Sequence, residues 1–118
     1  MKKIIKKLAT YVVTLYAQTL YNRVVRKAEE RHQKENTMIY VVSALNDVSR
    51  LCLYNRKQFR AMKKACRIYD PNYGVKKMKD GAWYHTADGG GKNCLSPVNR
   101  EARRLVFIQH ILKRAGLA

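Results

Sequence analysis

The absence of glycine and proline from residues 2–34 constrains the fold more than any other feature of the sequence. These two residues weaken or break a helix most strongly, so this stretch is free to form one. Its apolar side chains recur every three or four positions. One face is formed by Ile5, Leu8, Val12 and Leu15, and an adjoining stripe by Leu20, Val24 and Ala28. Because such positions share one side of a helix, the sequence predicts a helix over residues 2–34 that ends near Asn36 and Thr37.

The start of this segment also has features of a targeting segment. Four lysines within residues 2–7 precede the apolar residues 8–17, as in a secretory signal or a membrane-surface anchor. Leu15 is too large for the −3 position of a cleavage site after Ala17, which argues against cleavage. A membrane span needs about 20 apolar residues, and this run supplies roughly half of them. We therefore favour an uncleaved helix and keep a signal segment, or attachment to an anionic membrane surface, as alternatives.

The next segment is predicted to form a second long helix over about residues 38–68. Apolar residues there alternate spacings of four and three, which is a heptad seam. The seam consists of Val41, Leu45, Val48, Cys52, Asn55, Phe59, Met62, Cys66 and Tyr69. This helix is expected to pack on residues 2–34 as an antiparallel hairpin, or on a second copy of the chain. The residues predicted for such self-association are Val41, Leu45, Val48, Asn55, Phe59 and Met62. Asn55 is interpreted as the cap of a further helix, since Gln58 follows at capping-box spacing; the alternative is a buried amide that fixes the register.

A turn and a short hairpin are predicted to follow the second helix. Pro71 cannot continue a helix, and the residues after it favour a turn. Asp80-Gly81 then stands between residues that tolerate strand geometry. An Asp-Gly pair in that setting favours a two-residue turn, so we expect a β-hairpin over residues 75–86.

Residues 88–95 are predicted to form a flexible glycine-rich loop, and a last helix over residues 97–115 follows it. Ser96 is suited to cap this helix and Pro97 to occupy its first turn. Its expected buried stripe consists of Val98, Ala102, Leu105, Ile108, Leu112 and Ala115. These patterns together predict a single, mainly α domain over residues 1–118, with a long helical hairpin, a small β-hairpin and a C-terminal helix.

The net charge narrows the choice of partner. The chain has 25 Lys and Arg against 8 Asp and Glu, a formal charge of +17. Residues 1–60 carry 13 basic and 4 acidic residues, and residues 61–118 carry 12 and 4, so the excess is not confined to a tail. Such a surface favours polyanions, namely nucleic acid, an anionic membrane or an acidic protein surface. The densest basic stretch, residues 56–79, contains a single acid, Asp70.

The predicted phosphate contacts come from this stretch and from the start of the last helix. An ordinary solvated helix face mixes charges of both signs, whereas Arg56, Arg60 and Lys63 have no acid among them. The full set is Arg56, Arg60, Lys63, Lys64, Arg67, Lys76, Lys77, Lys79, Arg100, Arg103 and Arg104. Contacts of this kind release counterions from nucleic acid and carry little sequence information.

Aromatic residues accompany these cations. Exposed rings stack on unpaired bases, and the candidates here are Tyr73, Trp83 and Tyr84. The alternative is that these rings attach the predicted hairpin to the helices.

The sequence contains no specific catalytic or metal-binding signature. The loop from Asp88 to Lys92 differs from a phosphate-binding P-loop, because Asn93 stands where a hydroxyl holds magnesium. His85, Cys66 and Cys94 lack the paired spacing of a metal site. An odd number of cysteines without paired spacing is typical of free thiols in a reducing compartment. We therefore expect neither enzymatic activity nor a metal or cofactor.

These observations favour a nonenzymatic, basic protein that binds nucleic acid, DNA or RNA, without strong sequence specificity. The alternative is a structural subunit of a larger assembly, such as a virion or nucleoprotein particle, that docks on other proteins through the helical seam and the basic faces. A homo-oligomer is expected if the seam is used in this way. The corresponding location is the cytoplasm or a nucleoprotein or virion particle, and membrane association is the less favoured expectation.

Overall fold

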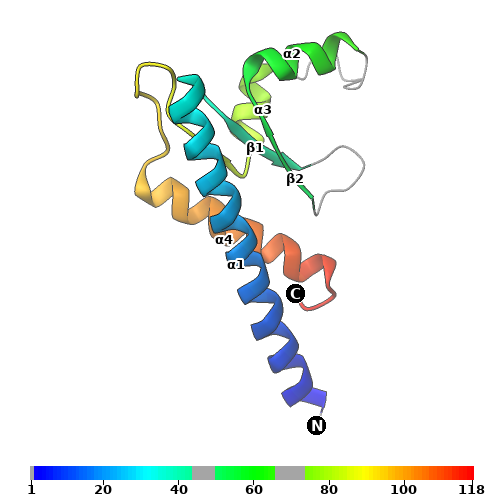
Figure 1. The fold of residues 1–118 in the computed structure, drawn as a ribbon. Helices are drawn as coiled ribbons and strands as arrows, with labels where there is room; N and C mark the ends of the chain where they lie inside the picture. Colours follow the sequence, from blue (N-terminus) through cyan, green and yellow to red (C-terminus); the bar gives the residue numbers. More distant parts are fainter. Residues whose placement is uncertain (1, 44–49, 66–73) are drawn as a thin grey trace.

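The computed structural model describes residues 2–43, 50–65 and 74–118 (Figure 1). In chain order these residues form α1 (Lys2–Glu35), β1 (Tyr40–Ser43), β2 (Leu51–Tyr54), α2 (Arg56–Lys64), α3 (Val75–Gly81), β3 (Tyr84–His85) and α4 (Pro97–Arg114). The predicted mainly α class is confirmed. Within the described part of the chain, the strands form one antiparallel sheet in the order β2-β1-β3.

The sheet separates two apolar cores. Val41 on one face of β1, and Ile39 just before the strand, belong to the larger core, which α1 and α4 cover. Tyr40, on the other face, belongs to a smaller core to which α2 and α3 contribute. Because successive residues of a strand point to opposite faces, the unbroken apolar run of β1 supplies both cores. Figure 1 shows α1 crossing α4, and their contact forms the largest helix interface among the described elements.

The ends of the two long helices follow the predicted signals. Asn36 has a positive φ of 51° and its N–H donates to the His32 carbonyl at 2.7 Å, which ends α1 in a left-handed cap. The Ser96 hydroxyl accepts from the Asn99 N–H at 3.2 Å and Pro97 occupies the first turn of α4. Gly116, with a φ of 73°, follows the end of α4. The predicted helices over residues 2–34 and 97–115 are thus confirmed within a residue at each end.

The predicted helix over residues 38–68 is wrong. The structure divides its described part between β1, β2 and α2, so the antiparallel helical hairpin does not form. The heptad seam is lost with it, since Val41 lies in the larger core and Phe59 in the smaller one. Of the other self-association residues, Asn55 caps α2, Met62 is half-buried in α2, and Leu45 and Val48 lie outside the described residues. A strand buried on both faces is apolar at every position, and such a run matches helical spacing by chance.

The predicted β-hairpin over residues 75–86 is also wrong. Residues Val75–Gly81 form α3, and Asp80-Gly81 is its last turn. Val75 and Met78 are three positions apart and both pack toward the smaller core, which is helical spacing. The short β3 that follows pairs with β1, more than forty positions earlier in the chain, through Tyr40–His85 and Val41–Tyr84.

The buried faces of both long helices match the predicted stripes only in part. In α1, Ala28 is buried and Leu20 and Val24 pack against the core as predicted. The predicted residues Ile5, Leu8, Val12 and Leu15 are instead 44–63% exposed, and Ala17 and Tyr21 are buried. In α4, Ile108 and Leu112 are buried as predicted, together with Phe107 and Ile111. Val98 and Leu105 are 78% and 51% exposed, and Ala102 and Ala115 are exposed as well. Within the described ranges, no helix is both long and apolar enough to cross a membrane.

Candidate nucleic-acid interface

The exposed residues of helix α2 are mostly basic. Its inner side is anchored by Phe59, which is 3% exposed, while Arg56, Lys57 and Arg60 are exposed. Arg56 and Arg60 are four positions apart and therefore lie on the same face. The helix contains no acidic residue, so no carboxylate within it pairs with these cations. Lys63 is half-buried and Lys64 is exposed at the last turn, and both make further contacts.

Helix α3 adds two exposed lysines next to the same small core. Met78 is 1% exposed and packs in one cluster with Tyr40 and Phe59, so that α2 and α3 are anchored to the same face of the sheet. Lys76 and Lys77 are exposed, Lys79 is half-buried, and Asp80 is the acid of this helix. We call the exposed cations of the two helices the basic face; it consists of Arg56, Lys57, Arg60, Lys76 and Lys77.

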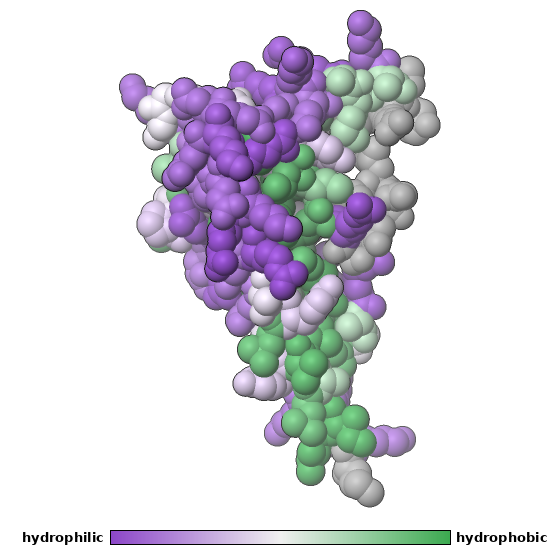
Figure 2. All heavy atoms as spheres, viewed as in Figure 1, coloured by the Kyte–Doolittle hydropathy of each residue, from purple (hydrophilic) through white to green (hydrophobic). Residues whose placement is uncertain are grey.

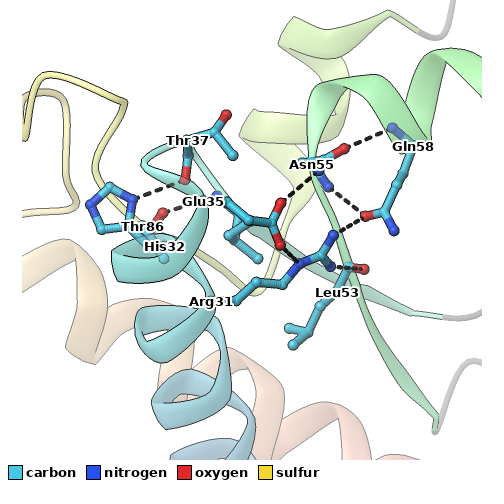
Figure 3. Close-up of polar contacts among 9 residues, drawn as sticks. Arg31, His32, Glu35, Thr37, Leu53, Asn55, Gln58 and Thr86 are labelled. Carbon is cyan, nitrogen blue, oxygen red and sulfur yellow. Dashed lines mark hydrogen bonds and ion pairs between the residues drawn. The ribbon is translucent and has the colours of Figure 1, made fainter.

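A polar cluster fixes the start of α2 against the end of α1 (Figure 3). Asn55 caps α2: its side-chain oxygen accepts from the Gln58 N–H at 2.8 Å, and the Gln58 side chain accepts from the Asn55 N–H at 3.1 Å. Arg31 of α1 donates to the Gln58 side chain at 2.6 Å and to the Leu53 carbonyl at 3.1 Å. The prediction that Asn55 begins a helix through a capping box is confirmed.

Glu35 completes this cluster. Its carboxylate pairs with Arg31 and accepts from the Asn55 side-chain amide at 2.9 Å. The hydrogen bond from Arg31, followed by that from Asn55, lowers the pKa of Glu35 below its usual value. The carboxylate is therefore ionised at neutral pH, and it holds the two side chains that orient the first turn of α2.

The three arginines predicted as phosphate contacts at the start of α4 are engaged within the molecule. Arg103 donates to the carbonyls of Lys79, at 3.3 Å, and Ala82, so it ties the end of α3 to α4. Arg104 forms an ion pair with Glu101, and the guanidinium carbon of Arg100 lies 5.5 Å from the centre of the Tyr84 ring. These predicted phosphate contacts therefore already have partners within the molecule, and they belong to α4 rather than to the basic face.

The structure places two of the three predicted stacking residues, Trp83 and Tyr84, in structural roles. Tyr84 is 1% exposed and its hydroxyl donates to Glu29, so this ring is not accessible to a base. Burial and the bond to Glu29 raise the pKa of Tyr84. Trp83 is half-buried, packs edge-on against Phe107 with ring centres 5.3 Å apart and donates to the Ser43 hydroxyl at 2.9 Å. Of the remaining predicted contacts, Tyr73 and Arg67 lie outside the described residues.

The glycine-rich loop is organised around its own carboxylate. Asp88 accepts from the N–H groups of Gly90 and Lys92, both at 2.9 Å, and from the Asn93 side chain at 2.8 Å. These bonds, that from Lys92 first, lower the pKa of Asp88. A Cβ added at Gly89 would lie 2.7 Å from the Asn36 carbonyl, so the loop packs closely on the end of α1. Because Asp88 occupies the N–H groups that would meet a phosphate, the loop is not a phosphate cradle in this conformation.

The described residues contain no group of three or more His, Cys, Asp or Glu that could hold a metal ion. Cys52 is half-buried, Cys94 is exposed, and neither is in a disulfide. Cys66 lies outside the described residues.

Two residues of the interface were not singled out from the sequence. Lys57 belongs to the basic face, and the signal for it was present, since it lies in the densest basic stretch. Arg31 positions α2 from 27 residues away. No local sequence pattern predicts such a contact, because it depends on the sheet that brings α1 and α2 together.

Comparison with known proteins finds no matching family, no matching curated protein and no matching solved structure.

Proposed function

We propose that this chain binds nucleic acid through the basic face of α2 and α3, by contacts to phosphates that carry little sequence specificity. The observation that supports this most directly is the placement of five exposed cations on two short helices anchored to one small core. Cations that neutralise phosphates release condensed counterions, and this release drives association. The fixed start of α2, held by Arg31 and Glu35, keeps part of this charge in a defined orientation.

The contrast with α4 supports the choice of surface. Arg103 and Arg104 already have partners inside the molecule, so transferring them to phosphates breaks existing bonds. In the described residues, the cations of the basic face have no such ion pair. Binding there costs only the loss of hydration and of side-chain freedom.

The test is the salt dependence of binding to a mixed-sequence DNA or RNA duplex. Affinity is expected to fall steeply with salt, because each neutralised phosphate contributes about 0.9 to the slope of log affinity against log salt. The double variant Arg60→Gln/Lys77→Gln should reduce that slope by about 2 and weaken binding to unrelated sequences equally. The matched control is Lys113→Gln/Arg114→Gln, which removes the same charge from two exposed residues at the end of α4.

The two variants separate a localised surface from a general charge effect. A loss confined to Arg60→Gln/Lys77→Gln supports the proposal. Equal losses in both variants, or an affinity that does not change with salt, would overturn it. Strong preference for one sequence would also overturn it, since phosphate contacts alone do not read bases.

A further inference from the structure

The N-terminal arm, which we define as residues 2–16 of α1, exposes large apolar side chains. Seven of them are between 44% and 64% exposed: Ile4, Ile5, Leu8, Tyr11, Val12, Leu15 and Tyr16. Figure 2 shows this arm as a hydrophobic projection below a mostly hydrophilic body. Contiguous exposed apolar surface of this kind marks an interaction site more often than chance exposure does.

The exposed apolar face of the arm and the buried face of α1 lie on opposite sides of the helix. At about 100° per residue, Ala17, Tyr21 and Ala28, which face the core, lie roughly 140° to 180° around the helix from Leu8. The seven exposed apolar residues span about 140° around Leu8, with Tyr11 and Tyr16 at the two margins. The apolar face of the arm therefore points away from α4 and is not a continuation of the buried face.

The charges of the arm are arranged around this apolar face. Lys2 and Lys7 lie about 40° beyond the tyrosine margins, and Lys3 and Lys6 lie on the opposite side. The first acidic residue of the chain is Glu29, so the arm carries only positive charge. A broad apolar face with amphipathic rings at its edges and lysines beyond them is the arrangement of a helix lying in a membrane interface.

We propose that the N-terminal arm lies along an anionic lipid surface, with its apolar face in the headgroup region and its lysines at the lipid phosphates. The orientation is sterically possible because the core face of α1 is on the other side, which places α4 and the sheet in water. Beyond the arm, exposed Arg23 and Arg26 continue the line of the apolar face and meet the same headgroups. This inference is independent of nucleic-acid binding, since it uses a different end of the molecule.

A second copy of the chain fits this face less well. Two arms packed together would bring their lysines close with no carboxylate between them, which opposes association. The apolar face is also wider than the narrow seam that a two-helix coiled coil buries. An anionic surface instead offsets the lysine charge and accepts the whole width of the face.

The experiment is flotation of the full chain with vesicles of phosphatidylcholine alone, and with about one lipid in three replaced by phosphatidylserine. Binding is expected only with the anionic vesicles. Leu8→Gln/Val12→Gln should lower it at least about tenfold by removing apolar contact. The matched control, Val98→Gln/Leu105→Gln, removes exposed apolar side chains from α4 and should leave binding unchanged. All four positions are more than half exposed, so neither variant disturbs the core.

A fluorescent reporter distinguishes insertion from adhesion by charge. Tyr11→Trp places an indole at one margin of the face, and its emission should shift to shorter wavelength on anionic vesicles. The emission of the unmodified chain, which comes from Trp83 alone, should not shift. Arg60→Gln/Lys77→Gln should keep vesicle binding, because the basic face is not part of the arm.

Several outcomes would overturn the inference. One is that the unmodified chain does not bind anionic vesicles. A second is that Leu8→Gln/Val12→Gln and Val98→Gln/Leu105→Gln lose vesicle binding equally. Another is loss of binding with Arg60→Gln/Lys77→Gln but not with Leu8→Gln/Val12→Gln. An oligomer at high salt that disappears in the Leu8→Gln/Val12→Gln variant, without vesicle binding, would assign the face to a second copy instead.

Discussion

The two faces of the sheet differ in both their cores and their use of positive charge. On the α1 and α4 side, the core includes the rings of Tyr21 and Phe107, 5.5 Å apart at their centres. On the α2 and α3 side, a few residues around Phe59 and Met78 suffice to anchor two short helices. Arg103, Arg104 and Arg100 of α4 contact backbone, Glu101 and a ring, respectively, whereas the cations of the basic face are exposed to solvent.

This difference shows that a count of lysines and arginines does not locate a binding site. The same residue type stabilises the fold in α4 and remains available to a ligand in α2 and α3. What separates the two cases is the set of bonds already made within the molecule. Substitutions of matched residues on the two faces of the sheet should therefore differ in their effects on stability and on nucleic-acid binding.

The largest expected difference is between the two core phenylalanines. Phe107 is fully buried between Tyr21 and Trp83, so Phe107→Ala should lower the free energy of unfolding by about 3–5 kcal/mol. Phe59→Ala should act mainly on α2 and α3, because Phe59 packs in the small core to which both helices contribute. Hydrogen exchange should then show faster exchange in α2 with α1 and α4 still protected, together with weaker nucleic-acid binding. Equal loss of protection across the chain in Phe59→Ala would contradict this separation.

The next effect compares one arginine from each face. Arg103→Gln removes bonds to two backbone carbonyls and should lower the free energy of unfolding by about 1–3 kcal/mol, without changing the salt slope of binding. Arg60→Gln should reduce that slope by about 1 and leave the unfolding free energy nearly unchanged. Denaturant unfolding measures the stability of the two variants, and binding titrations at several salt concentrations measure their salt slopes. If both variants changed the same quantity, the division between structural and binding cations would be wrong.

The sequence allowed the two long helices to be predicted because their signals are local. The uninterrupted stretch before Asn36 and the Ser96-Pro97 start of α4 depend on neighbouring residues alone. The capping box at Asn55 was predicted for the same reason. The basic character of residues 56–79 was also visible, and with it most of the basic face.

The sheet and the buried faces could not be predicted from local patterns. Both faces of β1 are covered, so Ile39 to Val42 lack the alternation by which a half-buried strand is recognised. β3 exists only through pairing with β1. In α1 the apolar stripe of residues 5–15 was real, but it lies on the face opposite to the core, and periodicity does not reveal which apolar face meets the rest of the chain. The roles of Arg31 and Arg103 depend on the same long-range arrangement.

A smaller effect is expected at the junction that orients the basic face. Asn55→Ala removes the cap of α2 and the bond to Glu35, and should lower the unfolding free energy by about 1 kcal/mol. Asn55→Ser keeps a capping oxygen and should lose less. Circular dichroism and denaturant unfolding measure both variants, and nucleic-acid affinity should fall in the same order. Equal stability of the two variants would show that the cap does not support α2.

The smallest expected effect is the pH dependence contributed by His85, which lies beside Tyr40 with ring centres 6.4 Å apart. Burial is the main cause that lowers the pKa of His85; the Thr86 carbonyl opposes it, and the charges of Arg103 and Lys79 add to it. The unfolded chain then binds a proton more readily than the folded one, so stability is complete above the ordinary pKa of about 6.5 and declines as pH falls through the lowered value. His85→Gln removes the titrating group. Thermal unfolding between about pH 7 and pH 5, above the range in which carboxylates titrate, should show a decline in the unmodified chain that is reduced in the variant. An unchanged pH profile in His85→Gln would mean that the strand next to the small core tolerates a charged imidazole, and that this side of the sheet is more hydrated than its burial indicates.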